Sequence, residues 1–583
     1  MSLFRKFAYS AATVALLASA PAAVHAQQTT SNLRGSVAGD DGSVVSGASV
    51  VIVHSPSGTA TVTSTGPNGR FSAAGLRAGG PYVVTITADG YTPERLEGIF
   101  LGLGGATNVP VILGTGGATD VIVVTGQALN LGSLATGPSA RFNADDIDGL
   151  PSISRDPRDI ARLSPFANID AENGDAISLA GANNRLNSFT LDGVAQNDVF
   201  GLNASGFPSE NRGPVSIDAL EALSVEIAPY DVQYNNFTGG TINAVSRSGT
   251  NEFHGSAYYF FTNQDFIGDR TEDVTLGTSD FEETTFGATL GGPIIQDRLF
   301  FFASYERFNR TQPLDRGPVG GPPALNVENG VTQAEVDQIL GIMQTVYGLN
   351  LTNFNEANLD NQDEKFLISL DWNINEDHRA KFTYNSSEGG SVQERSDQAD
   401  IGTPSTWYNR AEELQAYSLQ VFSDWNENLS TEVRLSYSTQ DTQQAAVDGS
   451  DFAQFDIVTP TGGTVSVGPD FFRHANELAN ELFQLKARAE YVYGDHLLSV
   501  GFERSAQDVF NLFVPGSEGS YDFASINDLQ NRTASSLFYQ NAVTNDENDG
   551  AASFGYAVNS FYAQDEFTVN DFLTLTFGLR YDT

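Results

Sequence analysis

The feature that most limits how this chain can fold is an alternation of apolar and polar residues that recurs between about residue 251 and residue 583. The clearest run places Phe366, Ile368, Leu370, Trp372 and Ile374 between Lys365, Leu367, Ser369, Asp371 and Asn373, and residues 483–491 and 573–581 repeat the pattern. Successive side chains of a strand point to opposite faces of its sheet, so each run predicts one apolar and one polar face. Transmembrane barrel strands show this pattern with the apolar face toward lipid. A soluble β-sandwich shows it with the apolar face inward.

The connections between the runs favour the barrel. Very short turns at 292–298 and 375–378 alternate with long polar loops at 310–363 and 439–481, as at the two ends of a membrane barrel. Aromatic residues gather near strand ends, at 258–261 and 300–302, as they do at a membrane interface. We predict about eleven strands, near 253–262, 281–291, 299–309, 364–374, 379–387, 414–426, 430–440, 481–493, 496–509, 558–569 and 572–582.

The N-terminus predicts export. Arg5 and Lys6 precede an apolar stretch at 7–17, and a small-residue cleavage site separates Ala26 from Gln27. Residues 1–26 therefore form a predicted signal peptide. No later stretch reaches the roughly 18 apolar residues of a spanning helix, so a membrane form of the chain requires a closed barrel.

The amino-acid composition limits the possible partners, secondary structure and metal sites of the protein. The 72 acidic and 30 basic residues give a net charge of -42, which argues against a nucleic-acid partner because phosphates attract cations. Abundant Phe, Tyr and Gly with two Met favour strands and turns over helices. The absence of cysteine excludes disulfides and Cys-ligated metal sites.

A first folded unit is expected over residues 33–113. Its strands are predicted at Leu33–Val37, Ala48–His54, Thr59–Ser64, Gly69–Ala73, Tyr82–Ala88 and Val109–Leu113, with Asp-Gly and Asn-Gly turns between them. The motifs Gly35-Ser36-Val37, Gly69-Arg70-Phe71 and Gly90-Tyr91 resemble the carboxypeptidase regulatory-like domain, a transthyretin-like sandwich. Zinc chemistry has little support, because only His474 has a Glu at i+3 (Glu477). We expect no enzyme, no metal and no cofactor.

A short β-branched run follows a Gly-rich linker: Asp120-Val121-Ile122-Val123-Val124-Thr125-Gly126. Val and Thr favour extended backbone, and an extended run on flexible tethers can add a strand to another protein's sheet. The alternatives are a last strand of the preceding unit or a buried strand of the next.

Residues 130–250 carry several motifs in a fixed order. Arg185 and Asn187 precede a hairpin-like Asp192-Gly193, a helix is predicted at Ile217–Leu223 and a strand at Val225–Ile227, and Gly239-Gly240-Thr241-Ile242-Asn243 and Ser248-Gly249-Thr250-Asn251 follow. Together with the run at 120–126, these motifs resemble the plug domain of TonB-dependent outer-membrane receptors. With the N-terminal sandwich, they most resemble the Oar-like subgroup.

The resemblance implies a mainly β fold. Its parts are a transthyretin-like β-sandwich, an α+β plug domain and the first half of a transmembrane antiparallel β-barrel. The expected divisions are 1–26 (signal peptide), 27–114 (sandwich), 115–129 (linker with Ton box), 130–250 (plug) and 251–583 (partial barrel). It also implies that the Ton-box segment (Asp120–Gly126) contacts TonB, and that Arg185, Asn187, Asp192, Gly193, Gly239 and Gly240 are structural in the plug. Of these, Arg185 and Asp192 are expected to pack the plug against the barrel wall.

The implied function is TonB-dependent, energy-coupled uptake of a scarce solute of the siderophore, cobalamin, oligosaccharide or peptide class. The implied partners are TonB with its inner-membrane energising complex, outer-membrane lipid and lipopolysaccharide, and the unknown solute. The implied location is the outer membrane of a Gram-negative bacterium, with the sandwich and plug facing the periplasm. The alternative is a surface adhesion or signalling protein whose barrel is an anchor.

Three expectations concern the barrel region. Thr332 and Glu335 have capping-box spacing, and an apolar stripe from Val336 to Tyr347 predicts a helix packed on an external loop. The acidic segment Thr544–Gly550 departs from Ca²⁺-loop spacing and is expected to be a solvated loop tip. Because receptors of this family close a barrel of about 22 strands, and the chain stops at 578–583 within a strand pattern, we expect a fragment or a truncated gene that forms no working pore as given.

Overall fold

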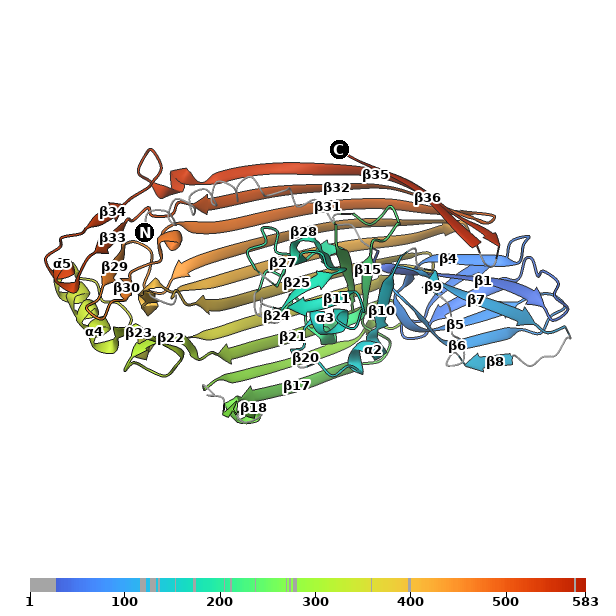
Figure 1. Ribbon diagram of the computed structural model, residues 1–583. Coiled ribbons are helices and arrows are strands. Elements are labelled where there is room, and N and C mark those ends of the chain that lie inside the picture. The colour runs from blue at the N-terminus through green and yellow to red at the C-terminus, as the bar shows by residue number, and fades with distance from the viewer. Residues whose placement is uncertain are drawn as a thin grey trace.

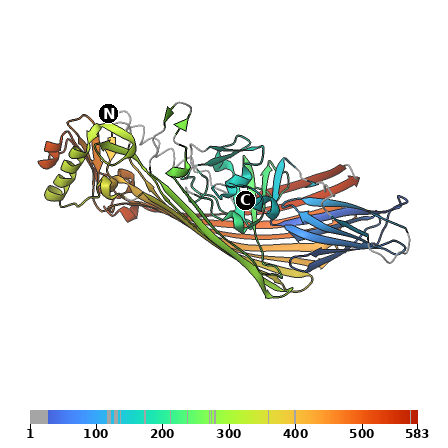
Figure 2. The ribbon, with the colours of Figure 1, turned by 90° about the horizontal axis from the view of Figure 1, so that it is seen from below.

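The computed structural model describes residues 28–115, 122–125, 133–134, 137–152, 154–170, 175–203, 205–209, 212–235, 237–268, 270–271, 274–275, 280–357, 359–396, 400–570 and 573–583. A long curved sheet dominates the molecule (Figure 1). The N-terminal sandwich lies at one end of this sheet, folded loops lie at the other end, and the plug lies on one face (Figures 1 and 2).

The N-terminal sandwich consists of two sheets around an apolar core that includes Leu33, Ile52, Val84, Leu101 and Val109. One sheet has the order β4 (Arg70–Arg77), β1 (Thr30–Gly39), β7 (Ala106–Leu113), β9 (Ser133–Leu134). The other has the order β3 (Thr59–Ser64), β2 (Ser49–His54), β5 (Gly79–Thr87), β6 (Glu94–Leu101), β8 (Ile122–Thr125). All six expected strands are confirmed, and β6 is an additional one.

The plug is built on a five-stranded sheet with the order β10 (Ser139–Asn143), β15 (Leu220–Ile227), β16 (Gly240–Ser246), β13 (Ser188–Leu191), β14 (Val194–Ala195). Two short helices, α2 (Ala144–Asp148) and α3 (Pro157–Ala161), and a hairpin of β11 (Ala167–Asp170) and β12 (Ala176–Leu179) pack beside it. The helix predicted at Ile217–Leu223 is wrong. Only a 3-10 turn at Ile217–Ala219 forms, because Leu220–Ile227 is drawn into the sheet between β10 and β16, where nearly every residue is buried.

The curved sheet has eleven antiparallel strands, as predicted. They are β17 (His254–Asn263), β20 (Glu282–Ile295), β21 (Leu299–Thr311), β24 (Asp360–Asn373), β25 (His378–Gln393), β27 (Tyr408–Asn426), β28 (Leu429–Ala446), β31 (Asn476–Tyr493), β32 (His496–Phe513), β35 (Ala552–Asn570) and β36 (Leu573–Asp582). The sheet is open, with β17 and β36 as its edges.

The solvent exposure of the two faces of this sheet distinguishes a membrane barrel from a soluble sandwich. On β24, Phe366 and Trp372 are 39% and 47% exposed, whereas Lys365 and Ser369, on the opposite face, are 3% and 0% exposed. The polar face is covered by the plug and the apolar face is open, which is the arrangement of a membrane barrel and the reverse of a soluble sandwich. We call the plug-covered polar face the wall.

The long loops fold into a layer of their own. It contains β22 (Leu314–Val319), β23 (Ala324–Thr332), α4 (Gln333–Ile342) continued by a π-helical turn at Met343–Tyr347, α5 (Ile526–Gln530), and a sheet of β26 (Asp400–Gly402), β30 (Thr464–Val467), β29 (Gln454–Val458), β33 (Ser520–Phe523) and β34 (Ser536–Phe538). The predicted capping box of Thr332 and Glu335 starts α4, and Val336, Ile339 and Met343 bury the helix stripe in the layer's core. Two further short strands, β18 (Arg270–Thr271) and β19 (Val274–Thr275), form a separate hairpin. Across the described residues, we find no helix with the length and apolarity that a membrane span needs.

Candidate functional site

Asp192 joins the plug to the wall. It lies in the turn between β13 and β14 and is 1% exposed. Its carboxylate accepts hydrogen bonds from the backbone N–H (3.1 Å) and hydroxyl (2.5 Å) of Ser246 within the plug. From β25 of the wall, the Thr383 hydroxyl donates at 2.8 Å and the Lys381 ammonium at 3.4 Å. One carboxylate therefore holds two plug strands together and ties both to the wall.

Gly193 lets this turn lie directly against the wall. Its φ of +74° is in the left-handed region, and a Cβ there would stand 1.5 Å from Nη1 of Arg434 on β28. The backbone carbonyl of Asp192 accepts a hydrogen bond from Gln420 Nε2 at 3.2 Å. A residue with a side chain would be strained at this φ and would have to displace the Arg434 guanidinium.

Arg185 and Asn187 act inside the plug. Arg185 is exposed and donates from Nη2 to the carbonyl of Gly201 at 2.5 Å, so the structure does not place it at the wall, where it was expected. Asn187 is buried and donates from Nδ2 to the carbonyl of Ile177 at 2.8 Å. Gly239 lies against it, because a Cβ at Gly239 would stand 2.3 Å from Asn187 Oδ1. Gly240 packs similarly on the backbone of β15, with 2.9 Å from a built Cβ to the carbonyl of Glu226.

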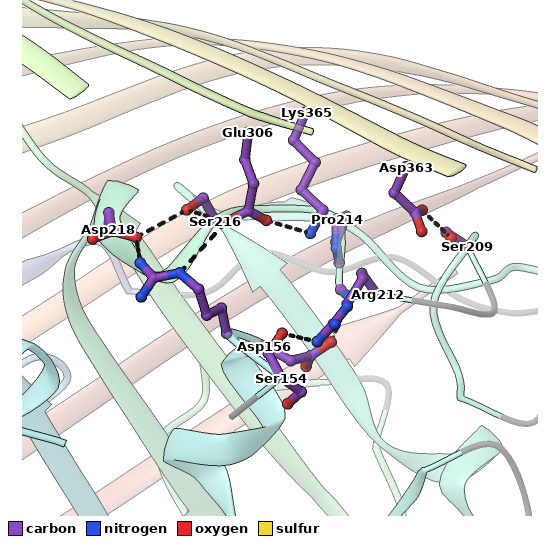
Figure 3. A network of polar contacts seen from close by, with 12 residues as sticks. Ser154, Asp156, Ser209, Arg212, Pro214, Ser216, Asp218, Glu306, Asp363 and Lys365 are labelled. Atoms are coloured by element: carbon purple, nitrogen blue, oxygen red, sulfur yellow. Dashed lines mark hydrogen bonds and ion pairs between the residues drawn. The ribbon is translucent and has the colours of Figure 1, made fainter. Parts of the chain in front are cut away.

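A second group of plug–wall contacts centres on an ion pair of the wall, Glu306 and Lys365, with 2.9 Å between carboxylate and ammonium (Figure 3). Both side chains are nearly inaccessible to solvent. The plug residue Ser216 donates its hydroxyl to Glu306 at 3.0 Å, and the guanidinium of Arg155 lies 3.9 Å from the same carboxylate while it pairs with Asp218. Burial of this pair is thus compensated by plug donors.

Further wall carboxylates receive plug donors in the same way. Ser209 donates to Asp363, the Asn203 amide donates to Glu412 at 2.6 Å, and Arg212 pairs with Glu283 at 2.7 Å. With Glu306, these acids come from four of five neighbouring strands: Glu283 from β20, Glu306 from β21, Asp363 from β24 and Glu412 from β27, with β25 between the last two. Sequence reasoning missed this row. A signal was available for Glu283 and Glu306, which occupy plug-facing positions of predicted strands, but not for Asp363 and Glu412, which lie just before the predicted starts of β24 and β27.

Several plug carboxylates have shifted pKa values, and Asp156 and Glu226 show the two opposite directions. Burial disfavours the charged form of Asp156, but the paired Arg158 guanidinium, 2.8 Å away, more than offsets this and holds the Asp156 pKa below its usual range. Burial raises the pKa of Glu226 to about 7, and the nearby Arg141 only partly opposes that shift. Asp156 also accepts the backbone N–H of Gly213 at 2.6 Å, which anchors the 212–216 segment that carries Ser216.

The Ton-box segment is described for Ile122–Thr125, and Asp120, Val121 and Gly126 lie outside the described residues. Ile122–Thr125 forms β8, which runs parallel to β6 of the sandwich. The signal peptide and its cleavage site at Ala26 and Gln27 also lie outside the described residues.

The sandwich itself is docked on the short-turn end of the curved sheet. Arg77 pairs with Asp371 and donates to the Asn373 amide oxygen at 3.1 Å, and the Arg77 and Asp371 side chains are 9% and 1% exposed. Other contacts join the sandwich to this end of the sheet, among them Asn251 N–H to the Pro56 carbonyl (2.9 Å), Ser64 to Glu427 (2.9 Å), Asn68 to Asp495, and Arg34 to Glu566 (3.0 Å). The contacts therefore extend from the segment before β17 to β35.

No metal-binding group is found among the described residues: nowhere do three or more His, Asp or Glu side chains converge. His474 is buried, its pKa is lowered by that burial, and its Nδ1 accepts the backbone N–H of Glu518 at 3.2 Å. Glu477 is exposed on β31, so the two residues form no common site.

Comparison with known proteins agrees with this architecture. The family model for an outer membrane beta barrel domain matches residues 245–346 and 339–583, and that for a carboxypeptidase regulatory-like domain matches 32–114. The TonB-dependent transporter Oar of Myxococcus xanthus is 32% identical over 257 residues, which cover 42% of this chain and 22% of that protein. The outer membrane transporter YddB of Escherichia coli has the same fold, with a TM-score of 0.56 at 12% identity over 76% of this chain and 56% of that one.

These matches span less than a quarter of the Oar transporter and little more than half of YddB. The barrel model nevertheless covers more than half of this chain. The protein thus belongs to the outer-membrane β-barrel proteins.

Proposed function

We propose that this protein moves a scarce solute across the outer membrane by TonB-coupled rearrangement of its plug. The Ton-box segment receives TonB, the loop layer captures the solute, and the plug blocks the path until TonB pulls on it. Siderophores, cobalamin, oligosaccharides and peptides are the candidate solute classes. The protein performs no covalent chemistry in this proposal.

The observation that carries the proposal is the polar character of the plug–wall contact. The plug core is apolar, but of the described wall residues only Phe302 and Leu367 join it. The other contacts described above are hydrogen bonds and ion pairs to Asp192, Glu306, Asp363 and Glu412. Water can replace such contacts when the plug moves, because hydrogen bonds to water compensate most of the loss. An apolar interface of the same size would hold the plug permanently.

The proposal is tested by breaking strand addition at the Ton-box segment. Val123→Pro together with Val124→Pro removes a backbone N–H from each edge of the segment, whereas Val123→Thr together with Val124→Thr keeps β-branched side chains and both N–H groups. Introduced into the chromosomal gene, the double Pro variant is expected to abolish growth on one limiting solute of the four classes, and the double Thr variant is expected to preserve it. Full growth of the double Pro strain on every such solute, at normal surface abundance, would refute the Ton-box assignment.

The adhesion or signalling alternative rests on the folded loop layer. This layer has its own five-stranded sheet and core, and Phe455 stacks on both Tyr521 and Phe523. If the layer served adhesion alone, cell-surface binding would be the same in cells with and without TonB. Solute accumulation that stops when TonB is absent would favour transport.

A further inference from the structure

The sandwich holds four residues of the Ton-box segment as an edge strand. In the parallel register of β6 and β8, Ile122 to Thr125 lie opposite Glu94 to Glu97. β8 is last in the order β3-β2-β5-β6-β8, so within the described part of the chain its outer edge pairs with no strand. Figure 1 shows β8 at the outer border of the sandwich, with β6 on one side only.

The chain that leads toward β8 is also fixed on the sandwich. The Thr92 N–H donates to the Gly114 carbonyl at 3.0 Å, and Tyr91 forms an isolated bridge with Thr115. Thr115 donates its hydroxyl to the Asp40 carboxylate at 3.0 Å. The end of β7 and the start of β6 therefore set the direction in which the linker leaves.

An edge strand of this kind has one occupied and one open side. Adjacent residues of a strand direct their N–H and C=O groups to opposite edges, so pairing with β6 uses only alternate residues of β8. The remaining groups are available for strand addition. Because the backbone is already extended, a partner strand avoids part of the entropy loss of ordering a free segment.

We propose that the sandwich presents the Ton-box segment to TonB. A strand of TonB adds to the open edge of β8, so that β6, β8 and the TonB strand form one continuous sheet and the sandwich remains in the complex. The inference rests on the proposed function, because it takes Asp120–Gly126 as the Ton box. In this proposal the role of the sandwich is to keep the Ton-box segment extended by pairing it with β6.

A disulfide lock tests the presentation. The chain has no cysteine, so Glu97→Cys with Thr125→Cys, which are opposite each other in the register, can form only the intended bond. The control is Val62→Cys with Thr125→Cys, because Val62 is 59% exposed on β3, at the far edge of the same sheet. The first pair is expected to cross-link in the purified protein and the control pair is not. Absence of the first cross-link, or equal yields for both pairs, would overturn the placement of β8.

Binding of the purified periplasmic C-terminal domain of TonB then shows whether pairing with β6 presents the Ton-box segment to TonB or hides it. The oxidised protein is expected to bind that domain at least as tightly as the reduced protein, and up to about tenfold more tightly, because β8 is pre-ordered. Loss of binding on oxidation, regained on reduction, would mean that β6 hides the segment, and the presentation would be wrong. Failure of the reduced protein to bind would contradict the Ton-box assignment itself.

Two proline variants in the Glu97→Cys, Thr125→Cys background give a second measurement. Val123 and Val124 direct their N–H groups to opposite edges of β8. The Pro variant whose lost N–H faces the open edge should weaken TonB binding and keep the cross-link. The Pro variant whose lost N–H faces β6 should weaken the cross-link. Identical effects of the two variants on both readouts would contradict strand addition at the open edge.

Discussion

Asp192 and Arg185 belong to one plug motif but differ in the burial and in the number of their side-chain contacts. Asp192 is buried and accepts hydrogen bonds from Ser246, Thr383 and Lys381, whereas Arg185 is exposed and makes one hydrogen bond to Gly201. Asp192→Ala would leave the Lys381 ammonium, only 8% exposed, without its carboxylate. Removing one partner of a buried ion pair typically costs about 3–5 kcal/mol. Arg185→Ala loses a single, partly buried side-chain hydrogen bond, with a cost of about 1 kcal/mol.

The measurement is urea resistance of the purified protein in detergent, followed by protease cleavage within the plug. Asp192→Ala should shift the midpoint far more than Arg185→Ala, and Asp192→Asn, which keeps one acceptor oxygen, should fall between them. Equal shifts for Asp192→Ala and Arg185→Ala would show that the wall contacts contribute little to holding the plug.

At this scale, the sequence predicted the plug side of the contacts better than the wall side. The motif around Asp192 was recognisable, but its wall partners Lys381 and Thr383 lie about 190 residues later. Glu306 stands at a plug-facing position of a predicted strand, whereas Asp363 falls at the end of a predicted loop, because β24 begins four residues before the strand predicted at 364–374. Their donors, Ser216 and Ser209, lie in irregular segments of the plug, which carry no periodic signal.

Among the secondary-structure elements, α4 is stabilised by the hydrogen bonds of its first turn. Glu335 accepts the Thr332 N–H at 2.8 Å and, with its other oxygen, the Thr461 hydroxyl at 2.6 Å and N–H at 3.1 Å. Partial burial opposes ionisation, but the hydrogen bonds from Thr461 and Thr332 outweigh it and lower the pKa of Glu335. A lowered pKa means stability that is present above the unfolded value of about 4.3 and is lost as the pH falls through the folded value.

We therefore expect the loop layer to resist denaturant better at pH 7 than below about pH 4. Glu335→Gln should be less stable than the wild type at pH 7, and the difference should shrink in acid. Fluorescence of Trp407, which is buried in the same core, reports the unfolding of this layer. Glu356→Gln, an exposed change in the same layer, is the control and should leave the midpoint at pH 7 unchanged. A Glu335→Gln midpoint equal to that of the wild type at pH 7 would contradict the cap's contribution.

Some strands are predicted by the alternation of apolar and polar residues, and others form because neighbouring strands pair with them. β24 and β31 follow from alternation, because their apolar residues lie on the open face and their polar residues lie mostly on the wall face. β17 alternates less clearly, since aromatic residues occupy the consecutive positions 258–261. β6 was missed, since Glu94, Arg95, Glu97 and Gly98 interrupt any apolar alternation. Residues 220–223 were assigned to a helix because a 3.6-residue spacing and a strand buried on both faces give similar short apolar runs.

For the whole molecule, the least predictable feature is the docking of the sandwich. The sequence indicated a sandwich and a barrel, but the contacts between them join residues far apart in the chain, such as Arg77 with Asp371 and Arg34 with Glu566. Single charged residues at strand ends carry no signal of their partners. The docked sandwich also covers part of the plug, where Ala78 and Leu103 pack on Ala222 and Val245.

The Arg77–Asp371 pair should hold this docked position. Arg77→Asp or Asp371→Arg places two like charges together at a site where the wild-type side chains are 9% and 1% exposed. Like charges at an interface cost several kcal/mol, so either change should favour the undocked sandwich. Because the chain lacks cysteine, Ala222→Cys gives a single probe at a position that is 1% exposed beneath the sandwich.

Maleimide labelling of Ala222→Cys in outer-membrane vesicles, with maleimide on the periplasmic side, is expected to accelerate by at least about tenfold in either single charge variant, given that energetic cost. The double variant, Arg77→Asp with Asp371→Arg, restores an opposite-charge pair and should return the labelling rate toward that of the parent. Val62→Cys, exposed on the sandwich surface, should label at one rate in all four backgrounds. If the single variants left the Ala222→Cys rate unchanged, this ion pair would have no part in docking. If the double variant labelled as fast as the singles, the effect would come from local damage and not from the paired charges, because only a pair can be rescued by exchanging its signs.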